Sequence, residues 1–349
     1  MIKSLTRRST LAALGAAAAT TLSGQALAQQ PVVTLRLHQM LPQQAPLPSI
    51  GLIPWAEKIE KESGGRIKIQ LFHAMQLGGG SPATLFDQAR NGVVDITWTV
   101  LGYTPGRFPK TEVFELPFMS KNAESSSRAI QEYVEKFAPE EFKDVKLIAV
   151  HTHGPGLFHT KEPVTGLESL RGMKIRGGSR IINIMLEDLG ATPVGMPVPA
   201  VSEALSKGVI SGTTIPWEVA PALKVHELVK NHTTFAGDRG LYTQTFAVSM
   251  NKAAYDKLPA DLKKVIDDNS GVEAAAHFGR AMDEGDRRGR DIAVKAGNNI
   301  VALDIAETQR WRRTASAVED KWAAEVAKRG IDGKKLAAEA RALVAKHTK

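Results

Sequence analysis

The chain has 349 residues, enough for about two domains, and its hydrophobic share of 43% is sufficient for buried cores. Its formal net charge is +8, but no block of consecutive basic residues occurs, so we expect no nucleic-acid partner; the mild positive charge fits an anionic small ligand. The chain contains no cysteine, which excludes disulfides and thiol chemistry.

The N-terminal segment has the order of a secretory signal peptide. Basic Lys3, Arg7 and Arg8 precede an apolar, alanine-rich run, and an Ala-Leu-Ala cleavage site ends at residue 28. The run is too short for a membrane-spanning helix. We therefore expect residues 1–28 to be a signal peptide and the mature protein, with a charge near +5 without those three basic residues, to be periplasmic. The arginine pair also fits a twin-arginine signal, which leaves the twin-arginine and the general export routes open.

The first part of the mature chain alternates strands and helices. Polar–apolar patterning predicts three strands, over residues 32–37, 66–72 and 93–98. Helical stripes between them give a β-α-β-α-β order, which indicates a mostly parallel sheet with helices on both faces. In such sheets ligands bind beyond the carboxyl ends of the strands. His38, Trp98 and Tyr103 fall at such ends and are therefore candidate ligand contacts.

A predicted helix over 123–137 leads to a strand over 145–150, which runs into two histidines, His151 and His153. A His-x-His pair at a strand end is also the first metal-ligand pair of amidohydrolases. That fold needs an eightfold barrel and further ligands from later strands, and the sequence shows neither. We expect these histidines to line a hinge, with His153 as a candidate ligand contact and no metal site.

A short strand predicted over 173–175 ends in Arg176, followed by two glycines and Ser179. Ser179 is placed to cap an amphipathic helix that Gly190 ends. An arginine at a strand end, beside a helix N-terminus, can present a planar fork of five donors to an anion. The alternative from local sequence alone is a surface arginine in a strand–helix loop.

The rest of the chain indicates a second α/β unit and a helical C-terminal part. Strand–helix alternation continues over 164–232, and a strand over 240–251 can cross back to the first unit. From Gly271 to about Ala296 the sequence has no proline and predicts one long helix. Further helices are predicted over 309–328 and 333–346.

Seven short motifs occur in a fixed order along the mature chain. They are Gln76-Leu77-Gly78, Phe114–Phe118 (FELPF), Leu170–Arg176 (LRGMKIR), Gly190–Val194 (GATPV), Ala204–Gly212 (ALSKGVISG), Met250-Asn251-Lys252 and Leu258-Pro259. In this order they resemble the DctP-type substrate-binding proteins of TRAP transporters, the family of periplasmic substrate-binding subunits, over nearly the whole mature chain.

The resemblance implies an α/β, two-lobed periplasmic-binding-protein fold with crossing hinge strands and a long helix spanning both lobes. We expect lobe I to comprise residues 29–151 and 241–280, and lobe II to comprise residues 152–240 and 281–349. It also implies that an organic acid binds in the cleft between the lobes and that its carboxylate pairs with Arg176.

Two departures from the family pattern bear on the ligand. Many members carry a further arginine or polar residue where this chain has Pro155–Phe158, and sialic-acid-type members carry an asparagine where this chain has Ser211–Glu218. Both changes remove polar partners and favour a monocarboxylate with an aromatic or apolar tail. The predicted ligand contacts are Arg176, Trp217, Thr214, Trp98, Tyr103, Phe158, His153 and His38.

The resemblance further implies delivery of the ligand to TRAP transporter membrane subunits, without covalent chemistry. We therefore expect no catalytic residue, no cofactor and no metal, and we expect a monomer. Two alternatives stay open: an exported metal-dependent hydrolase that uses His151 and His153, and a binding protein that serves a sensor.

Overall fold

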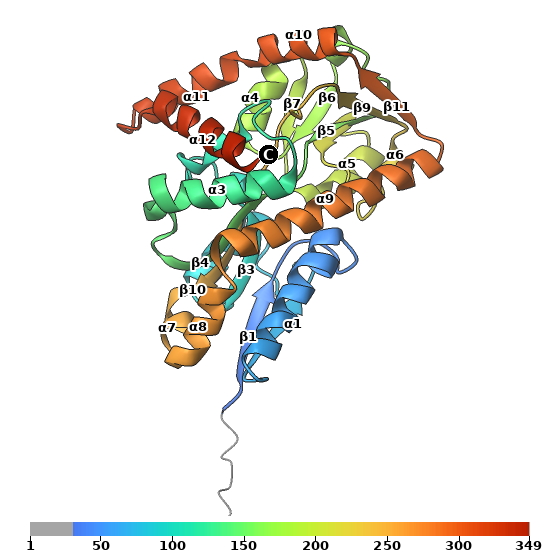
Figure 1. Ribbon diagram of the computed structural model, residues 1–349. Coiled ribbons are helices and arrows are strands. Elements are labelled where there is room, and N and C mark those ends of the chain that lie inside the picture. The colour runs from blue at the N-terminus through green and yellow to red at the C-terminus, as the bar shows by residue number, and fades with distance from the viewer. Residues whose placement is uncertain (1–30, 349) are drawn as a thin grey trace, which may run out of the picture. The chain divides into compact units, whose positions relative to one another are not determined.

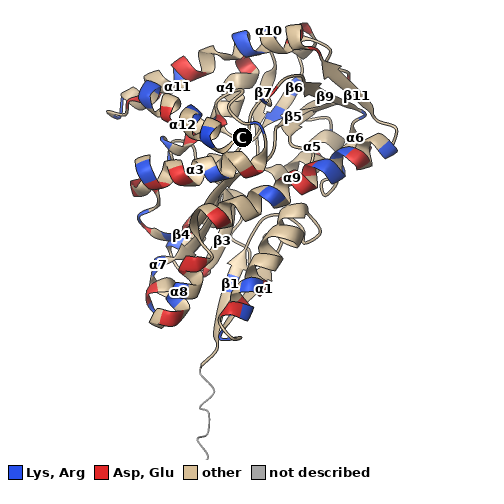
Figure 2. Ribbon diagram, in the orientation of Figure 1, with Lys and Arg blue, Asp and Glu red and all other residues tan. Residues whose placement is uncertain are grey.

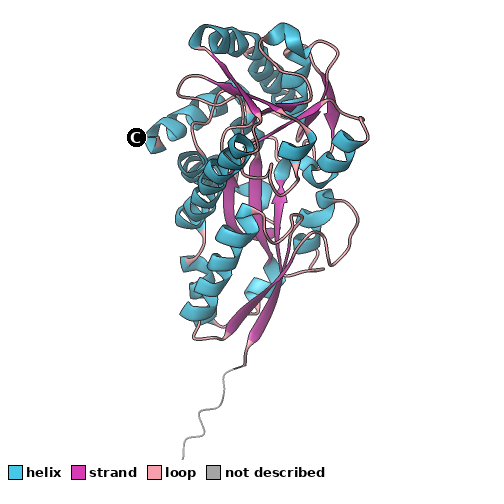
Figure 3. Ribbon diagram, turned by 90° about the vertical axis from the view of Figure 1, so that its right-hand side faces the viewer, coloured by secondary structure: helices cyan, strands magenta, loops and turns pink. Residues whose placement is uncertain are grey.

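The computed structural model describes residues 31–348, and within them the strands form two separate β-sheets, drawn in magenta in Figure 3. The predicted signal peptide, residues 1–28, lies outside the described residues. From Val32 onward the chain forms one compact unit, so the lobe boundaries stay a prediction.

The first sheet has the strand order β2-β1-β3-β10-β4. Its strands are β1 (Val33–His38), β2 (Ile67–Phe72), β3 (Ile96–Val100), β4 (Val145–Thr152) and β10 (Thr245–Asn251). Strands β1, β2 and β3 are parallel, as predicted, whereas β10 lies antiparallel between β3 and β4. The start of β10 therefore lies at the edge of the sheet where β3 and β4 end.

The second sheet has the order β11-β9-β5-β8-β6-β7. Its strands are β5 (Leu157–Thr160), β6 (Lys174–Gly177), β7 (Thr192–Gly195), β8 (Gly212–Ile215), β9 (Asn231–Phe235) and β11 (Asn299–Leu303). The sequence analysis did not identify β5, β9 or β11, because these four- or five-residue strands lack clear polar–apolar alternation. Strand β5 is antiparallel to both of its neighbours, so this sheet is also more mixed than predicted.

Helices cover these sheets (Figure 1). They are α1 (Ile53–Glu62), α2 (Leu85–Arg90), α3 (Ala123–Phe137), α4 (Arg180–Asp188), α5 (Val201–Ser206), α6 (Val225–Leu228), α7 (Lys252–Asp256), α8 (Ala260–Asp268), α9 (Gly271–Lys295), α10 (Ile305–Ala315), α11 (Ala317–Ala327) and α12 (Gly333–His347). Within residues 31–348, none of these helices combines the length and the apolar content needed to cross a bilayer. Figure 2 shows Lys and Arg interspersed with Asp and Glu along the helices in this view.

The 25-residue helix α9 contacts parts of both lobes, and glycines permit the close approach. A Cβ at Gly279 would lie 2.7 Å from the Cα of Glu124 in α3, and one at Gly289 would lie 2.1 Å from the Trp217 carbonyl oxygen beyond β8. Figure 1 shows α3 and α9 side by side. The predicted long helix is therefore confirmed, and the fold is the two-lobed α/β arrangement.

Candidate functional site

Arg176 ends its strand as the sequence predicts, but it is fully buried rather than a surface residue. Ser179 caps the following helix α4 by accepting a hydrogen bond from the Ile182 amide at 3.3 Å. Arg176 Nε donates to the Met196 carbonyl oxygen at 2.9 Å, and Nη1 donates to the Thr214 carbonyl oxygen at 3.3 Å. These bonds fix the plane of the guanidinium on two sides.

The third nitrogen of this guanidinium, Nη2, has no hydrogen-bond partner among the described residues, and Arg176 takes part in none of their ion pairs. A buried charge without a counter-charge is costly, because the interior solvates it less well than water does. The site around Arg176 is thus electrostatically complementary to an anion.

Tyr103 and His153 lie close enough to Arg176 to experience its charge. Burial raises the pKa of Tyr103, while the positive charge of Arg176 opposes that rise, and the hydroxyl accepts a hydrogen bond from the Val198 amide at 2.8 Å. Burial lowers the pKa of His153 to about 4, and the charge of Arg176 adds to this effect. His153 is therefore neutral near pH 7 and adds no charge to the site. Its ring nitrogens have partners within the protein, since Nδ1 lies 2.5 Å from the Gly154 carbonyl oxygen and Nε2 accepts from the Gln244 amide.

Tyr103 and His153 also line a small cavity of about 20 Å³ at the edge of the first sheet. The other lining residues are mostly apolar: Met40, Leu41, Trp98, Val100, Val198, Ile215, Pro216, Glu218, Val219, Gln244 and Phe246. The Trp98 and Phe246 rings are nearly parallel, with centroids 5.2 Å apart and an interplanar angle of 6°. A flat apolar body would find aromatic and aliphatic surface here.

A larger cavity, of about 530 Å³, shares Tyr103 with this small one. Its walls come from the loop around Gly102–Pro105 and from the segments Gly177–Arg180 and Gly195–Pro197. Tyr103 therefore stands between the two spaces, beside Arg176 and Met196.

Five of the predicted residues come together in this region: Arg176, Thr214, Tyr103, His153 and Trp98. Thr214 has a supporting position, since its hydroxyl donates to the Arg176 carbonyl oxygen at 3.1 Å while its own carbonyl holds the guanidinium. Trp98 Nε1 donates to His151 Nε2 at 2.9 Å, and the same side chain lines the small cavity.

Three predicted residues do not join this group. The ring nitrogens of His38 interact with the Gln88 side chain at 2.7 Å and the Leu77 amide at 3.3 Å. Phe158 packs in the core against Phe235 and Trp311, with ring centroids 6.3 Å and 5.5 Å away.

Trp217 is the third of these residues, and it packs against histidines of the second sheet. Its ring centroid lies 5.1 Å from that of His159 and 4.9 Å from that of His232. Among the described residues, none of His38, Phe158 and Trp217 lines the small cavity or interacts with the Arg176 side chain. They stay sequence predictions that this geometry does not support.

The histidine pair considered as metal ligands makes hydrogen bonds within the protein. His151 accepts from Trp98, and His153 Nε2 accepts from the Gln244 amide at 3.2 Å. Burial lowers the pKa of His151 to about 3. In the part of the chain that the structure describes, no group of three or more His, Asp or Glu residues is arranged to hold a metal ion.

The sequence analysis missed Gln244 and Phe246 because they begin a strand rather than end one. Strand β10 is antiparallel to β3 and pairs Phe246 with Val100, so its first residues reach the same sheet edge as the ends of β1 and β3. Gln244 Nε2 is buried without a hydrogen-bond partner among the described residues. Gly178 makes room for it, since a Cβ there would lie 2.3 Å from the amide oxygen. The sequence signal that could have identified this contact is a polar residue, Gln244, at the start of a strand predicted to cross between the two units.

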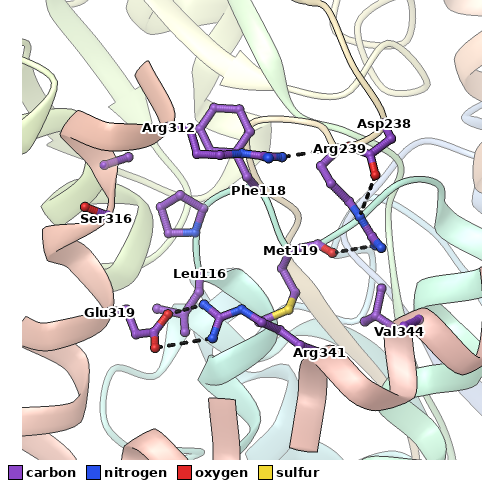
Figure 4. A pocket seen from close by; sticks show the side chains of 13 residues that line it. Leu116, Phe118, Met119, Asp238, Arg239, Arg312, Ser316, Glu319, Arg341 and Val344 are labelled. Atoms are coloured by element: carbon purple, nitrogen blue, oxygen red, sulfur yellow. Dashed lines mark hydrogen bonds and ion pairs between the residues drawn. The ribbon is translucent and has the colours of Figure 1, made fainter. Parts of the chain in front are cut away.

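A separate cavity of about 460 Å³ contains three arginines, and Figure 4 shows how they are arranged. Arg341 points to the Glu319 carboxylate, which accepts its Nη1 at 3.3 Å. Arg239 donates to the Met119 carbonyl oxygen at 3.0 Å, and Arg312 lies 5.1 Å from the centre of the Phe118 ring. We do not regard this cavity as the anion site, because its own acidic side chains, Asp238 and Glu319, already balance much of the charge.

Comparison with known proteins agrees with this geometry. Residues 45–325 match the family model described as bacterial extracellular solute-binding protein, family 7. A relative from Comamonas testosteroni, the outer membrane transporter protein TsaT, is 27% identical over 309 residues, which are 86% of this chain and 88% of the relative. The C4-dicarboxylate-binding periplasmic protein DctP of Rhodobacter capsulatus is 26% identical over 338 residues, or 95% and 99% of the two chains.

Solved structures with bound acids are more similar. A TRAP solute-binding protein from Rhodoferax ferrireducens with copurified benzoate is 49% identical, has a TM-score of 0.89, and covers 91% of this chain and 99% of its own. A marine metagenome TRAP protein with 3-hydroxybenzoate is 48% identical, with a TM-score of 0.90 and coverage of 91% and 100%. A Bordetella bronchiseptica TRAP protein with bound (R)- and (S)-mandelate is 33% identical, with a TM-score of 0.82 and coverage of 90% and 99%.

Proposed function

This chain belongs to family 7 of the bacterial extracellular solute-binding proteins and is the substrate-binding component of a TRAP transporter; on that basis we propose that its ligand is an aromatic monocarboxylate. The observation that carries the proposal is Arg176, which is fully buried, held by two carbonyl oxygens, and left with Nη2 unpaired. Its neighbours Tyr103 and His153 line the small apolar cavity. The benzoate, 3-hydroxybenzoate and mandelate bound by the relatives support the same ligand class.

In the proposed complex the ligand carboxylate pairs with the free edge of the Arg176 guanidinium. Tyr103 lies near Arg176, and its hydroxyl, which accepts from the Val198 amide, can donate its proton to the same carboxylate. The aromatic ring then occupies the apolar space between Trp98, Phe246 and the aliphatic residues. A charge-assisted hydrogen bond of this kind contributes roughly 1.5–3 kcal/mol, and burial of the ring adds to it.

The cavity is too small for a benzoate ring as it stands, so we propose that the lobes open to admit the ligand. The strands that cross between the lobes near Thr152 and Thr245 are the natural hinges. Closure excludes water and thereby strengthens the pair between Arg176 and the carboxylate. A transporter that recognises the closed form preferentially couples binding to transport.

Family members are periplasmic or extracellular proteins that deliver ligand to membrane subunits. For this chain we propose export by the signal peptide at residues 1–28, action as a monomer, and no enzymatic reaction. A sensor as the receiving partner would use the same ligand site as a transporter. Uptake of labelled ligand separates the two roles, because loss of the membrane subunits abolishes uptake only if this chain serves the transporter.

The test is a thermal-shift and calorimetric screen of the mature protein, freed of copurified ligand, over organic acids. Benzoate and mandelate should stabilise the protein, whereas succinate should not, because a second carboxylate has no cation to pair with in the cavity. A ligand at a hundred times its Kd stabilises by about 2.7 kcal/mol, so true ligands give clear shifts. Succinate binding more tightly than every aromatic acid would contradict the proposal.

A further inference from the structure

Glu218 is a buried acid in the lining of the small cavity, and the binding of a carboxylate gives it no role. It follows β8 in the segment Trp217-Glu218-Val219, and it is 3% exposed. Its Oε2 has no hydrogen-bond partner within residues 31–348. A polar atom that is buried, unpaired and in a cavity wall is costly unless something in the cavity binds it.

The position of Glu218 is fixed by the long helix α9. The Glu218 amide donates to Asp286 Oδ1 at 2.8 Å. A Cβ at Gly285, on the same helix, would lie 2.7 Å from the Glu218 Cβ, so the missing side chain at Gly285 allows this close contact. Glu218 is therefore held rigidly against α9, as a residue that recognises one atom of a ligand must be.

Glu218 and Arg176 have different neighbours among the described residues. The charge of Arg176 acts on Tyr103, Tyr242 and His153. Glu218 instead contacts α9, where its amide donates to Asp286 Oδ1, and within residues 31–348 no hydrogen bond or ion pair joins Glu218 to Arg176. A ligand anchored at Arg176 and lying along Trp98 and Phe246 therefore presents its ring edge, and not its carboxylate, to Glu218.

We propose that Glu218 binds a hydroxyl group on the ring of the ligand, so that the preferred substrates are ring-hydroxylated aromatic monocarboxylates. This inference rests on the proposed function. The hydroxyl satisfies the unpaired Oε2, and in return it is itself hydrogen-bonded inside an otherwise apolar cavity.

The protonation state of Glu218 suits this task. Burial, with the nearby Asp286 adding to it, raises the pKa of Glu218 well above its usual range, which favours the neutral acid over the carboxylate. A neutral carboxyl group can both donate to and accept from a phenolic hydroxyl. It also places no second negative charge near the ligand, whose single carboxylate has its cation at Arg176.

The experiment measures the affinities of the mature protein for benzoate, 3-hydroxybenzoate and 4-hydroxybenzoate by calorimetry. Because one buried hydrogen bond contributes about 0.5–1.5 kcal/mol, the wild-type protein should prefer one of the hydroxybenzoates over benzoate by about three- to tenfold. Glu218→Leu should abolish this preference, so that the ratio of hydroxybenzoate to benzoate affinity falls to about one. Glu218→Gln, which keeps a donor and an acceptor, should retain most of it.

Thermal unfolding of each variant, measured without ligand, shows whether it is folded. Glu141→Gln is the matched control, because Glu141 is a partly buried acid of raised pKa that interacts with Thr111 and does not line the cavity. An unchanged ratio of hydroxybenzoate to benzoate affinity in Glu218→Leu would overturn the inference and leave the proposed function intact. A wild-type protein that binds none of the three acids would overturn the proposed function, and this inference with it.

Discussion

Two arginine-containing regions of this protein differ in how their charges are satisfied. Arg176 is fully buried, is held by carbonyl oxygens, and has no carboxylate partner in the described chain. The three-arginine cavity of Figure 4 is larger and has more positive groups, but Arg341 pairs with Glu319, and that arginine side chain is 52% exposed. We propose from this comparison that the unmet, buried donor of Arg176 identifies the anion site of this protein better than cavity size or the number of arginines does.

The sharpest way to break this comparison is to remove each arginine in turn. Arg176→Ala should weaken binding of benzoate by about a hundredfold, because it leaves the ligand carboxylate buried without its cation. Arg341→Met should leave binding unchanged. Calorimetric titration of both variants decides the matter, and equal losses of affinity would refute the assignment of the anion to Arg176.

A buried acid near Arg176 should also make the free energy of unfolding depend on pH. Glu115 is 1% exposed, and burial raises its pKa to about 7, although Thr245 donates to its Oε1 from the amide at 3.1 Å and from the hydroxyl at 2.8 Å. Between pH 4.5 and 7 the folded state then binds more protons than the unfolded state, so this group lowers stability as pH rises.

Glu115→Gln removes that proton uptake while keeping an acceptor for Thr245. Relative to wild type, the variant should gain stability as the pH rises from 4.5 to 7, by at most about 1.4 kcal/mol per pH unit. Urea unfolding at pH 5 and pH 7.5 measures the change. A difference in unfolding free energy that stays constant over this range would show that Glu115 titrates normally.

A smaller effect is expected at Gln244, whose buried Nε2 is unpaired in the cavity wall. Gln244→Met keeps the length of the side chain but removes its donor, so aromatic acids should bind about three- to tenfold more weakly. Fluorescence titration can follow this change, since Trp98 lines the same cavity. Unaltered affinity would mean that the Gln244 amide does not contact the ligand.

The smallest effect on stability is expected in the three-arginine cavity of Figure 4. Arg341→Met should lower the unfolding free energy by less than about 1 kcal/mol, because an exposed ion pair is screened by solvent and salt. The loss should shrink further at high salt in a denaturation series. A loss of several kcal/mol that does not depend on salt would show that the pair is more deeply integrated than its exposure indicates.

Local sequence patterns were sufficient to predict the secondary-structure elements that surround Arg176. The apolar spacing after Ser179, the capping oxygen and Gly190 are all read within a dozen residues, and the helix forms where they predict it. The same holds for α3 and α9, whose bounds agree with the predicted 123–137 and 271–296 within a residue. The order of the short motifs was sufficient to identify the family.

The sequence by itself determined that an arginine ends a strand beside a capped helix, and it identified the family in which that arginine meets a carboxylate. Only the tertiary structure decided which side chains accompany it. Phe158 and Trp217 turn into the second lobe, whereas Gln244 and Phe246 reach the cavity from a strand far along the chain. The physical reason is that local spacing fixes the type of each element, but the antiparallel insertion of β10 between β3 and β4 sets which residues share an edge.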